Sequence, residues 1–97
     1  MKISFCHNWG GKLDAKKFTT IRRNPYWLDK RGEIHVYLNG SFYAKRKLKD
    51  VIRVPFGTID RSVVEADTGL SYPEALRVFE NFKINEDTMV CILFFFE

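Results

Sequence analysis

The chain has 97 residues, of which 45% are hydrophobic and 29% charged, and its formal net charge is +4. This length is below the ~100–150 residues of a common domain, so we expect one domain over residues 1–97 and exclude a multidomain enzyme. The composition is typical of folded proteins and excludes a disordered chain. The longest apolar run, Val90–Phe96, is far shorter than the ~20 residues of a membrane helix, and Met1–Cys6 lacks the apolar stretch of a secretory signal. We therefore expect a soluble cytoplasmic protein with no membrane partner.

Few side chains are available for a metal or a cofactor. Cys6 and Cys91 lie near opposite ends of the chain and form no C-x-x-C pair, and His7 and His35 are the only histidines. No zinc motif, P-loop or dinucleotide motif occurs, and the one Gly-Gly pair is too weak a signal for a phosphate loop. We expect reduced cysteines, no metal and no cofactor.

The charges are unevenly distributed along the chain. Residues 1–53 hold thirteen Lys or Arg against four Asp or Glu, a net charge of +9, whereas residues 54–97 hold three against eight, a net of −5. A basic half is typical of a surface that binds phosphate or another anion. The alternative is that charges separated along the sequence are mixed in space by the fold.

The first elements are read from β-branched and apolar residues between turn signals. Lys2–Cys6 is expected to be a strand, and His7–Leu13 a loop or short turn. Phe18–Arg23 is expected to be a second strand, which ends at the turn signal Asn24-Pro25.

A hairpin follows. Ile34, Val36 and Leu38 alternate with polar residues over Glu33–Asn39, and Asn39-Gly40 is a strong hairpin turn signal, so a long partner strand must follow. In that strand we expect the even positions to face the core and the odd ones to form a basic face, with a bend marked by Arg46 and Asp50. The expected core positions are Phe42, Ala44, Leu48, Ile52, Val54 and Phe56. Because so long a strand must bend or bulge, it favours a small sheet closed into a barrel.

Two helices and a last strand complete the pattern. Thr58–Ala66 has helical spacing, with Thr58 as N-cap and Gly69 available to end the segment. Ser71–Asn81 begins with a capping box formed by Ser71 and Glu74 and is amphipathic. Thr88–Phe96 is so apolar that we expect a strand buried on both faces. The fold class is therefore α+β, with five to six mostly antiparallel strands and two short helices.

Several short motifs resemble those of one family in order and spacing. They are Leu13–Arg22, with a small-basic-Lys-x-x-Thr-x-Arg pattern, the Arg31-Gly32-Glu33 step, the long strand Ala44–Arg53, and the Asp67-Thr68-Gly69 turn followed by Ser71–Leu76. Together they resemble the ASCH domains of the PUA-like superfamily over nearly the whole chain. The resemblance implies a small closed β-barrel with helices at one end, a cleft between them, and RNA, nucleotides or modified nucleosides as ligands.

One bacterial branch of that family hydrolyses the acetyl amide of N(4)-acetylcytidine. The Lys, Thr and Glu of that branch fall on Lys17, Thr20 and Glu74, which the resemblance implies as catalytic residues. Threonine is a weak nucleophile, and Lys17 could serve as its base only if burial or neighbouring cations lowered its pKa. The departures from the family pattern, Ala15 and Phe18-Thr19, remove no reacting group but leave the substrate open.

Each candidate has an ordinary structural alternative. Lys17 would otherwise be a solvated lysine, Thr20 a strand residue, and Glu74 a capping residue. Arg22 could hold a phosphate or base edge or form a surface ion pair, and the aromatic pair after Pro25 could stack a base or plug the barrel. The candidate ligand-binding residues are Lys16, Arg22, Arg23, Tyr26, Trp27, Lys45 and Lys47.

Three functions follow, in this order. The first is binding of RNA or a modified nucleoside through a basic cleft by a monomer or weak dimer. The second is hydrolysis of an acylated cytidine, and the third is regulation through a protein ligand. For the first two we expect Lys17, Thr20, Arg22 and Glu74 to meet in one cleft.

Overall fold

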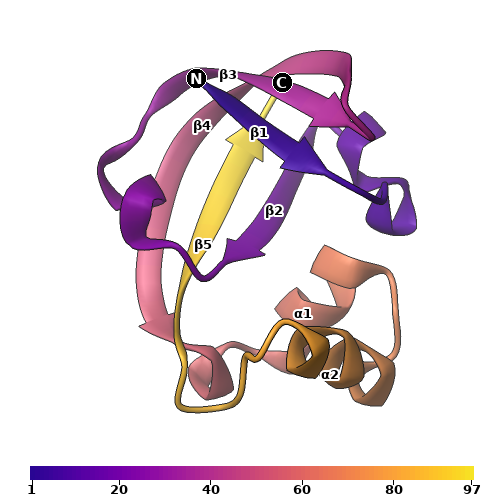
Figure 1. The fold of residues 1–97 in the computed structure, drawn as a ribbon, viewed down its shortest axis with the longest axis vertical. Coiled ribbons are helices and arrows are strands. Elements are labelled where there is room, and N and C mark those ends of the chain that lie inside the picture. Colours follow the sequence, from indigo (N-terminus) through magenta and orange to yellow (C-terminus); the bar gives the residue numbers. More distant parts are fainter.

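Five strands form one mixed sheet in the computed structural model, which describes residues 1–97 (Figure 1). The strands are β1 (Lys2–Phe5), β2 (Lys17–Arg22), β3 (Gly32–Leu38), β4 (Ser41–Pro55) and β5 (Met89–Phe96). Their order in the sheet is β1-β3-β4-β5-β2, and only β1 and β3 run parallel. The fold class α+β with mostly antiparallel strands is confirmed.

The sheet curls strongly but does not close, so the expectation of a closed barrel is wrong. Strands β1 and β2 are its two edges, and no backbone pairing joins them. Instead the side chain of Arg22 crosses from β2 and donates from Nη2 to the carbonyl oxygen of Ser4 on β1, at 3.0 Å. The four residues of β1 pair with β3 and not with β2, and the side-chain hydrogen bond from Arg22 connects the two edges instead.

The α-helices α1 (Arg61–Thr68) and α2 (Tyr72–Asn81) lie at one end of the curled sheet (Figure 1). Three short 3-10 helices, η1 (Trp9–Asp14), η2 (Pro25–Asp29) and η3 (Phe56–Thr58), lie in the connections between the other elements. The two expected α-helices are confirmed, and Gly69, at φ +69°, ends the first. That helix begins later than expected, with Asp60 as N-cap, because Thr58 belongs to η3. No helix is long and apolar enough to cross a bilayer.

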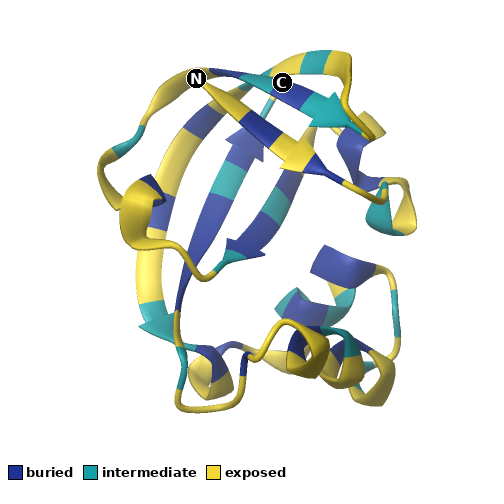
Figure 2. Cartoon of the chain, in the orientation of Figure 1, coloured by how far each residue is buried: buried dark blue, intermediate teal, exposed yellow.

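The buried apolar residues form two clusters, and β5 contributes to both. Most of β5 is buried (Figure 2). Cys91, Leu93 and Phe95 join the cluster enclosed by the sheet, while Val90 and Ile92 join the cluster under the helices. Alternate residues of a strand point to opposite faces, so β5 is covered on both sides. This confirms the expectation for the last strand.

The core positions of β4 differ from the simple alternation. The pairing register shifts between Leu48 and Asp50, so Val51 is 5% exposed while Ile52 is 40% exposed. A second shift opposite Val36 and Tyr37 on β3 leaves Phe42 51% exposed. A bulge inserts one unpaired residue and reverses which positions face inward beyond it. The even-position core is therefore wrong at Phe42 and Ile52.

Candidate functional site

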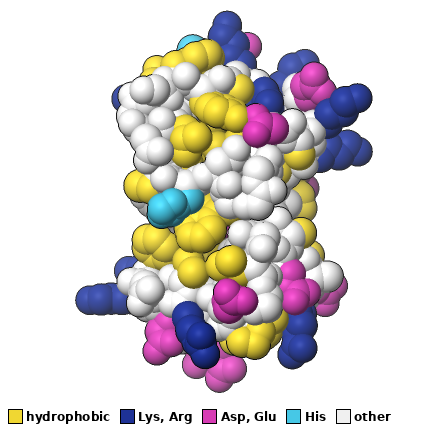
Figure 3. Space-filling model, turned by 90° about the vertical axis from the view of Figure 1, so that its right-hand side faces the viewer, with side chains coloured by type: hydrophobic (Ala, Val, Ile, Leu, Met, Phe, Trp, Pro, Cys, Tyr) yellow, Lys and Arg dark blue, Asp and Glu magenta, His cyan; other side chains and the backbone are white.

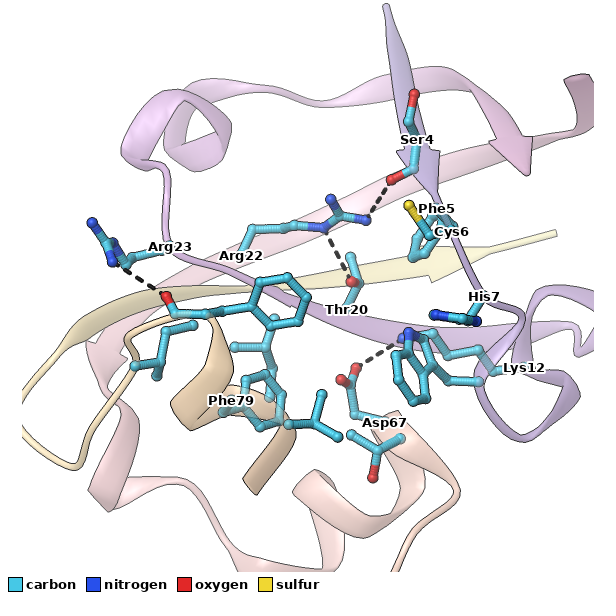
Figure 4. Close-up of a pocket in the computed structure, with 16 residues that line it drawn as sticks. Ser4, Phe5, Cys6, His7, Lys12, Thr20, Arg22, Arg23, Asp67 and Phe79 are labelled. Carbon is cyan, nitrogen blue, oxygen red and sulfur yellow. Dashed lines mark hydrogen bonds and ion pairs between the residues drawn. The ribbon is translucent and has the colours of Figure 1, made fainter. Parts of the chain in front are cut away.

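A cavity of about 360 Å³ lies between the ends of β1 and β2 and the helices (Figure 4). This volume is at the lower end of the ~300–1,000 Å³ of small-molecule sites. Figure 3 views the molecule from the side of η1, where apolar side chains gather around a histidine and most Lys and Arg lie toward the edges. The polar side chains of the cavity come mainly from η1, β2 and α1.

Lys12 and Asp67 form a buried ion pair in the wall of the cavity. Lys12 Nζ lies 3.1 Å from Asp67 Oδ1 and donates to the carbonyl oxygen of Thr19 at 2.7 Å. The hydroxyl of Thr19 donates to the same Asp67 oxygen at 3.1 Å. Burial lowers the pKa of Lys12 and raises the pKa of Asp67, and their mutual attraction opposes both shifts. Three elements, η1, β2 and α1, are thus held together by one polar network.

Two glycines allow η1 to approach the end of α1 closely enough for this pair. Gly10 and Gly69 both have positive φ, and a Cβ on Gly69 would lie 2.7 Å from Cα of Gly10. The side chain of Asn8 also fixes η1, since its Oδ1 accepts from the backbone N–H of Leu13 at 2.9 Å. Because neither glycine carries a Cβ, η1 packs close against the end of α1, and Lys12 on η1 can reach Asp67.

Arg22 and Thr20 lie on the same face of β2 and point toward one another (Figure 4). Arg22 Nε donates to Thr20 Oγ1 at 3.3 Å, and the guanidinium lies 4.6 Å from the ring centroid of Phe5. Burial lowers the pKa of Arg22, against the attraction of Asp67. The third nitrogen, Nη1, has no partner in the protein, so a charged donor remains for a ligand.

Asp67 keeps an acceptor for a ligand in the same way. The residue is only 5% exposed, and its second carboxylate oxygen, Oδ2, accepts no hydrogen bond. Nε of Arg46 is the only fully covered side-chain nitrogen or oxygen without a partner, so Oδ2 is open to the cavity. The hydroxyl proton of Thr20 also has no acceptor. The cavity therefore offers one carboxylate acceptor, one hydroxyl donor and one guanidinium donor.

Aromatic side chains form the rim and the remaining walls. Trp9, Phe79 and Phe82 line the cavity, and Phe82, just after α2, is 64% exposed. Arg23 donates from Nη1 to the carbonyl oxygens of Phe82 and Lys83, at 3.3 and 3.4 Å, which ties this rim to β2. An exposed ring beside buried polar groups suits a flat ligand that stacks and hydrogen-bonds at once.

The structure brings only part of the expected set together. Thr20, Arg22 and Arg23 line the cavity, but Lys17 and Glu74 do not. Lys17 pairs with Phe96 and is exposed, with Nζ 5.1 Å from the Phe96 ring centroid. Thr20 is three positions further along β2, so the two side chains point to opposite faces of the strand. Glu74 is exposed and accepts a hydrogen bond from the hydroxyl of Ser71 at 2.8 Å. The expected meeting of the four side chains is not found.

The other candidate ligand residues lie outside the cavity. Lys16, Lys45 and Lys47 are exposed on the surface. Tyr26 is also exposed, whereas Trp27 is 8% exposed and packs in the cluster enclosed by the sheet. The plug alternative therefore describes Trp27, and its ring is not available for stacking a base.

Sequence reasoning missed Lys12 and gave Asp67 no chemical role. A signal for each was present. Lys12 follows two glycines, which permit unusual close approaches. Asp67 lies in the last turn of α1, where the helix dipole disfavours a negative charge, so a compensating cation was to be expected. The two residues are 55 positions apart, and no local pattern links them.

No protein-family model matches the chain, and no curated protein or solved structure matches it. The chain also contains no group of three or more His, Cys, Asp or Glu side chains placed to hold a metal ion.

Proposed function

We propose that this chain is a nucleoside-binding module of the ASCH type, which holds a base in the cavity beside Arg22. One observation carries the proposal: around one largely apolar cavity, Asp67 Oδ2 and Arg22 Nη1 have no hydrogen-bond partner, and the Thr20 hydroxyl, which accepts from Arg22, keeps its proton free to donate. Small-molecule sites combine apolar walls with a few converging polar groups in this way. The family resemblance, which implies RNA or nucleoside ligands, supports the same conclusion.

The polar groups favour a base with an exocyclic amino group. The amino group of cytosine would donate to Asp67 Oδ2, and its ring nitrogen and carbonyl would accept from Thr20 and Arg22. Uracil carries a carbonyl where cytosine carries the amino group, so two acceptors would face each other at Asp67. Phe82 and Trp9 provide faces on which the base can stack.

The contacts favour binding over hydrolysis. The Thr20 hydroxyl is bonded to Arg22, and a guanidinium keeps its proton and is no general base. The family's implied base, Lys17, is not in the cavity, and Glu74 is bonded to Ser71. A lysine-activated threonine mechanism thus lacks its supporting contacts, and hydrolysis remains the second candidate only through the resemblance.

Calorimetric titration with cytidine and uridine tests the proposal. We expect cytidine to bind and uridine to bind at least about tenfold more weakly, because the wrong base leaves Asp67 facing an acceptor. Thr20→Val removes the hydroxyl at nearly constant volume and should weaken cytidine binding about 2- to 13-fold, equivalent to ~0.5–1.5 kcal/mol. Thr58→Val, on η3 outside the cavity, is the control and should bind as the wild type.

Equal affinity for cytidine and uridine, or no binding of either nucleoside, would contradict the proposal. Incubation with N(4)-acetylcytidine separates binding from hydrolysis, because a binding module returns the compound unchanged. Deacetylation that is lost in Thr20→Val would instead establish the hydrolase.

A further inference from the structure

The outer face of β1, β3 and β4 carries a second group of aromatic and basic side chains. We call this group the outer platform: Lys2, His35, Tyr37, Phe42, Lys45 and Lys47. The pairing register places Lys2, His35 and Lys45 in one row across the three strands, and Tyr37 beside Phe42 in the next. Cross-strand partners share a face, and the alternate residues Ile3, Ile34 and Val36 are buried on the other.

The rings of the outer platform contact one another and remain open to solvent. His35 and Tyr37 both meet Phe42 edge-on, with centroid distances of 5.6 and 5.9 Å. Phe42 is exposed over half its surface although it lies in the middle of this cluster. The β-bulge opposite Val36 and Tyr37 turns Phe42 outward, so its exposure is a result of the sheet geometry.

The charges around these rings are mainly positive. Lys2 Nζ lies 5.5 Å from the Tyr37 ring centroid, and Lys45 and Lys47 stand exposed on β4. Glu33 is the one acidic side chain on this part of β3, and it lies 3.6 Å from His35 and opposite Lys47. Exposed rings between lysines suit a ligand with flat apolar groups and regularly spaced negative charges.

The outer platform is continuous with the cavity through β1. Ser4 lies on the same face as Lys2, pairs in register with Tyr37 and lines the cavity. Its carbonyl oxygen accepts a hydrogen bond from Arg22, which also lines the cavity. A ligand chain bound on the outer platform can therefore enter the cavity by crossing β1 at Ser4.

We propose that the outer platform binds single-stranded nucleic acid, whose bases stack on Phe42 and its neighbours while its phosphates contact the lysines. This deepens the proposed function and rests on it: the base held in the cavity would belong to a strand and not to a free nucleoside. A single strand is favoured over a duplex, because only unpaired bases expose their faces for stacking.

Fluorescence anisotropy with a labelled cytidine-rich 8-mer, as RNA and as DNA, tests this in the full chain. Phe42→Ala should weaken oligonucleotide binding at least about fivefold and leave cytidine binding unchanged. Phe42→Tyr keeps an aromatic ring and should retain oligonucleotide binding. Leu76→Ala removes an exposed apolar side chain from α2 and is the matched control. The two labelled strands distinguish RNA from DNA as the source of the single strand.

The salt dependence tests the phosphate contacts. In Lys45→Gln/Lys47→Gln the slope of log affinity against log salt should become shallower by about 1.4, because each phosphate contact on a single strand contributes about 0.7. Lys30→Gln/Arg77→Gln removes two charges elsewhere and should leave the slope unchanged.

The outcomes separate the two proposals. If cytidine binds but the 8-mer binds no better, or Phe42→Ala binds the 8-mer as the wild type does, the inference about the outer platform fails and the proposed function stands. If neither cytidine nor the 8-mer binds, the proposed function fails as well. Dimerisation that is lost in Phe42→Ala would show that a second copy of the chain covers the outer platform, and would overturn the inference.

Discussion

Replacing Lys12 by methionine is expected to lower the free energy of unfolding by about 3–5 kcal/mol. The substitution keeps most of the apolar stem of the side chain but leaves the Asp67 carboxylate buried without its ion-pair partner. A domain of this size has only about 5–15 kcal/mol of stability in total, so the loss is a large share. Urea denaturation followed by tryptophan fluorescence measures it directly.

The double variant Lys12→Met/Asp67→Leu is the control. Because both charges disappear together, neither is left unpaired, and we expect a stability within about 1–2 kcal/mol of the wild type. The double variant should no longer distinguish cytidine from uridine, since the acceptor is gone. A double variant as unstable as the single one would show that shape, and not the unpaired charge, determines the cost.

The same pair makes stability depend on pH. The folded state raises the pKa of Asp67 above 3.8, so it binds a proton that the unfolded chain releases, and stability falls as pH rises through the raised pKa. The folded state lowers the pKa of Lys12 below 10.5, so stability rises again from that lowered pKa up to about 10.5. Unfolding midpoints of the wild type, minus those of the double variant, should therefore pass through a minimum between the two folded pKa values. A flat difference would contradict this.

Gly69→Ala is the second substitution expected to have a large effect. Alanine at this position must adopt the left-handed backbone of Gly69, which costs an L-residue about 1–2 kcal/mol. Its Cβ would also lie 2.7 Å from Cα of Gly10, a backbone atom that cannot move away freely. Crowding of this kind adds about 1–3 kcal/mol, so we expect a loss of roughly 2–5 kcal/mol of unfolding free energy. Thermal and urea denaturation give the value.

Gly11→Ala separates strain from crowding. Gly11 also has positive φ, at +72°, but a Cβ there meets no atom within 4 Å. Gly11→Ala should therefore lower the free energy of unfolding only by the ~1–2 kcal/mol of backbone strain. Equal losses in both variants would show that the contact between η1 and α1 relaxes at little cost.

The elements of this protein follow from local patterns in its sequence. Alternation over β3, the turn at Asn39-Gly40 and the spacing of α2 each depend on residues only a few positions apart, and the structure contains all three. The unbroken apolar run of β5 predicted a strand covered on both faces for the same reason. Thr20 and Arg22 could also be placed on one face of β2, because that needs only the period of a strand.

The tertiary structure alone decided how these elements close and which side chains meet. The bulges that expose Phe42 and Ile52 depend on how β4 pairs with its two neighbours, and the open edge between β1 and β2 depends on where a four-residue strand finds its partner. The pairing of Lys12 with Asp67 needed the approach of Gly10 to Gly69, between segments remote in sequence. Local sequence carries the preference of each segment, whereas contacts between distant segments are selected by the packing of the whole chain, which is why the Lys12–Asp67 pair in the cavity wall could not be read from motifs.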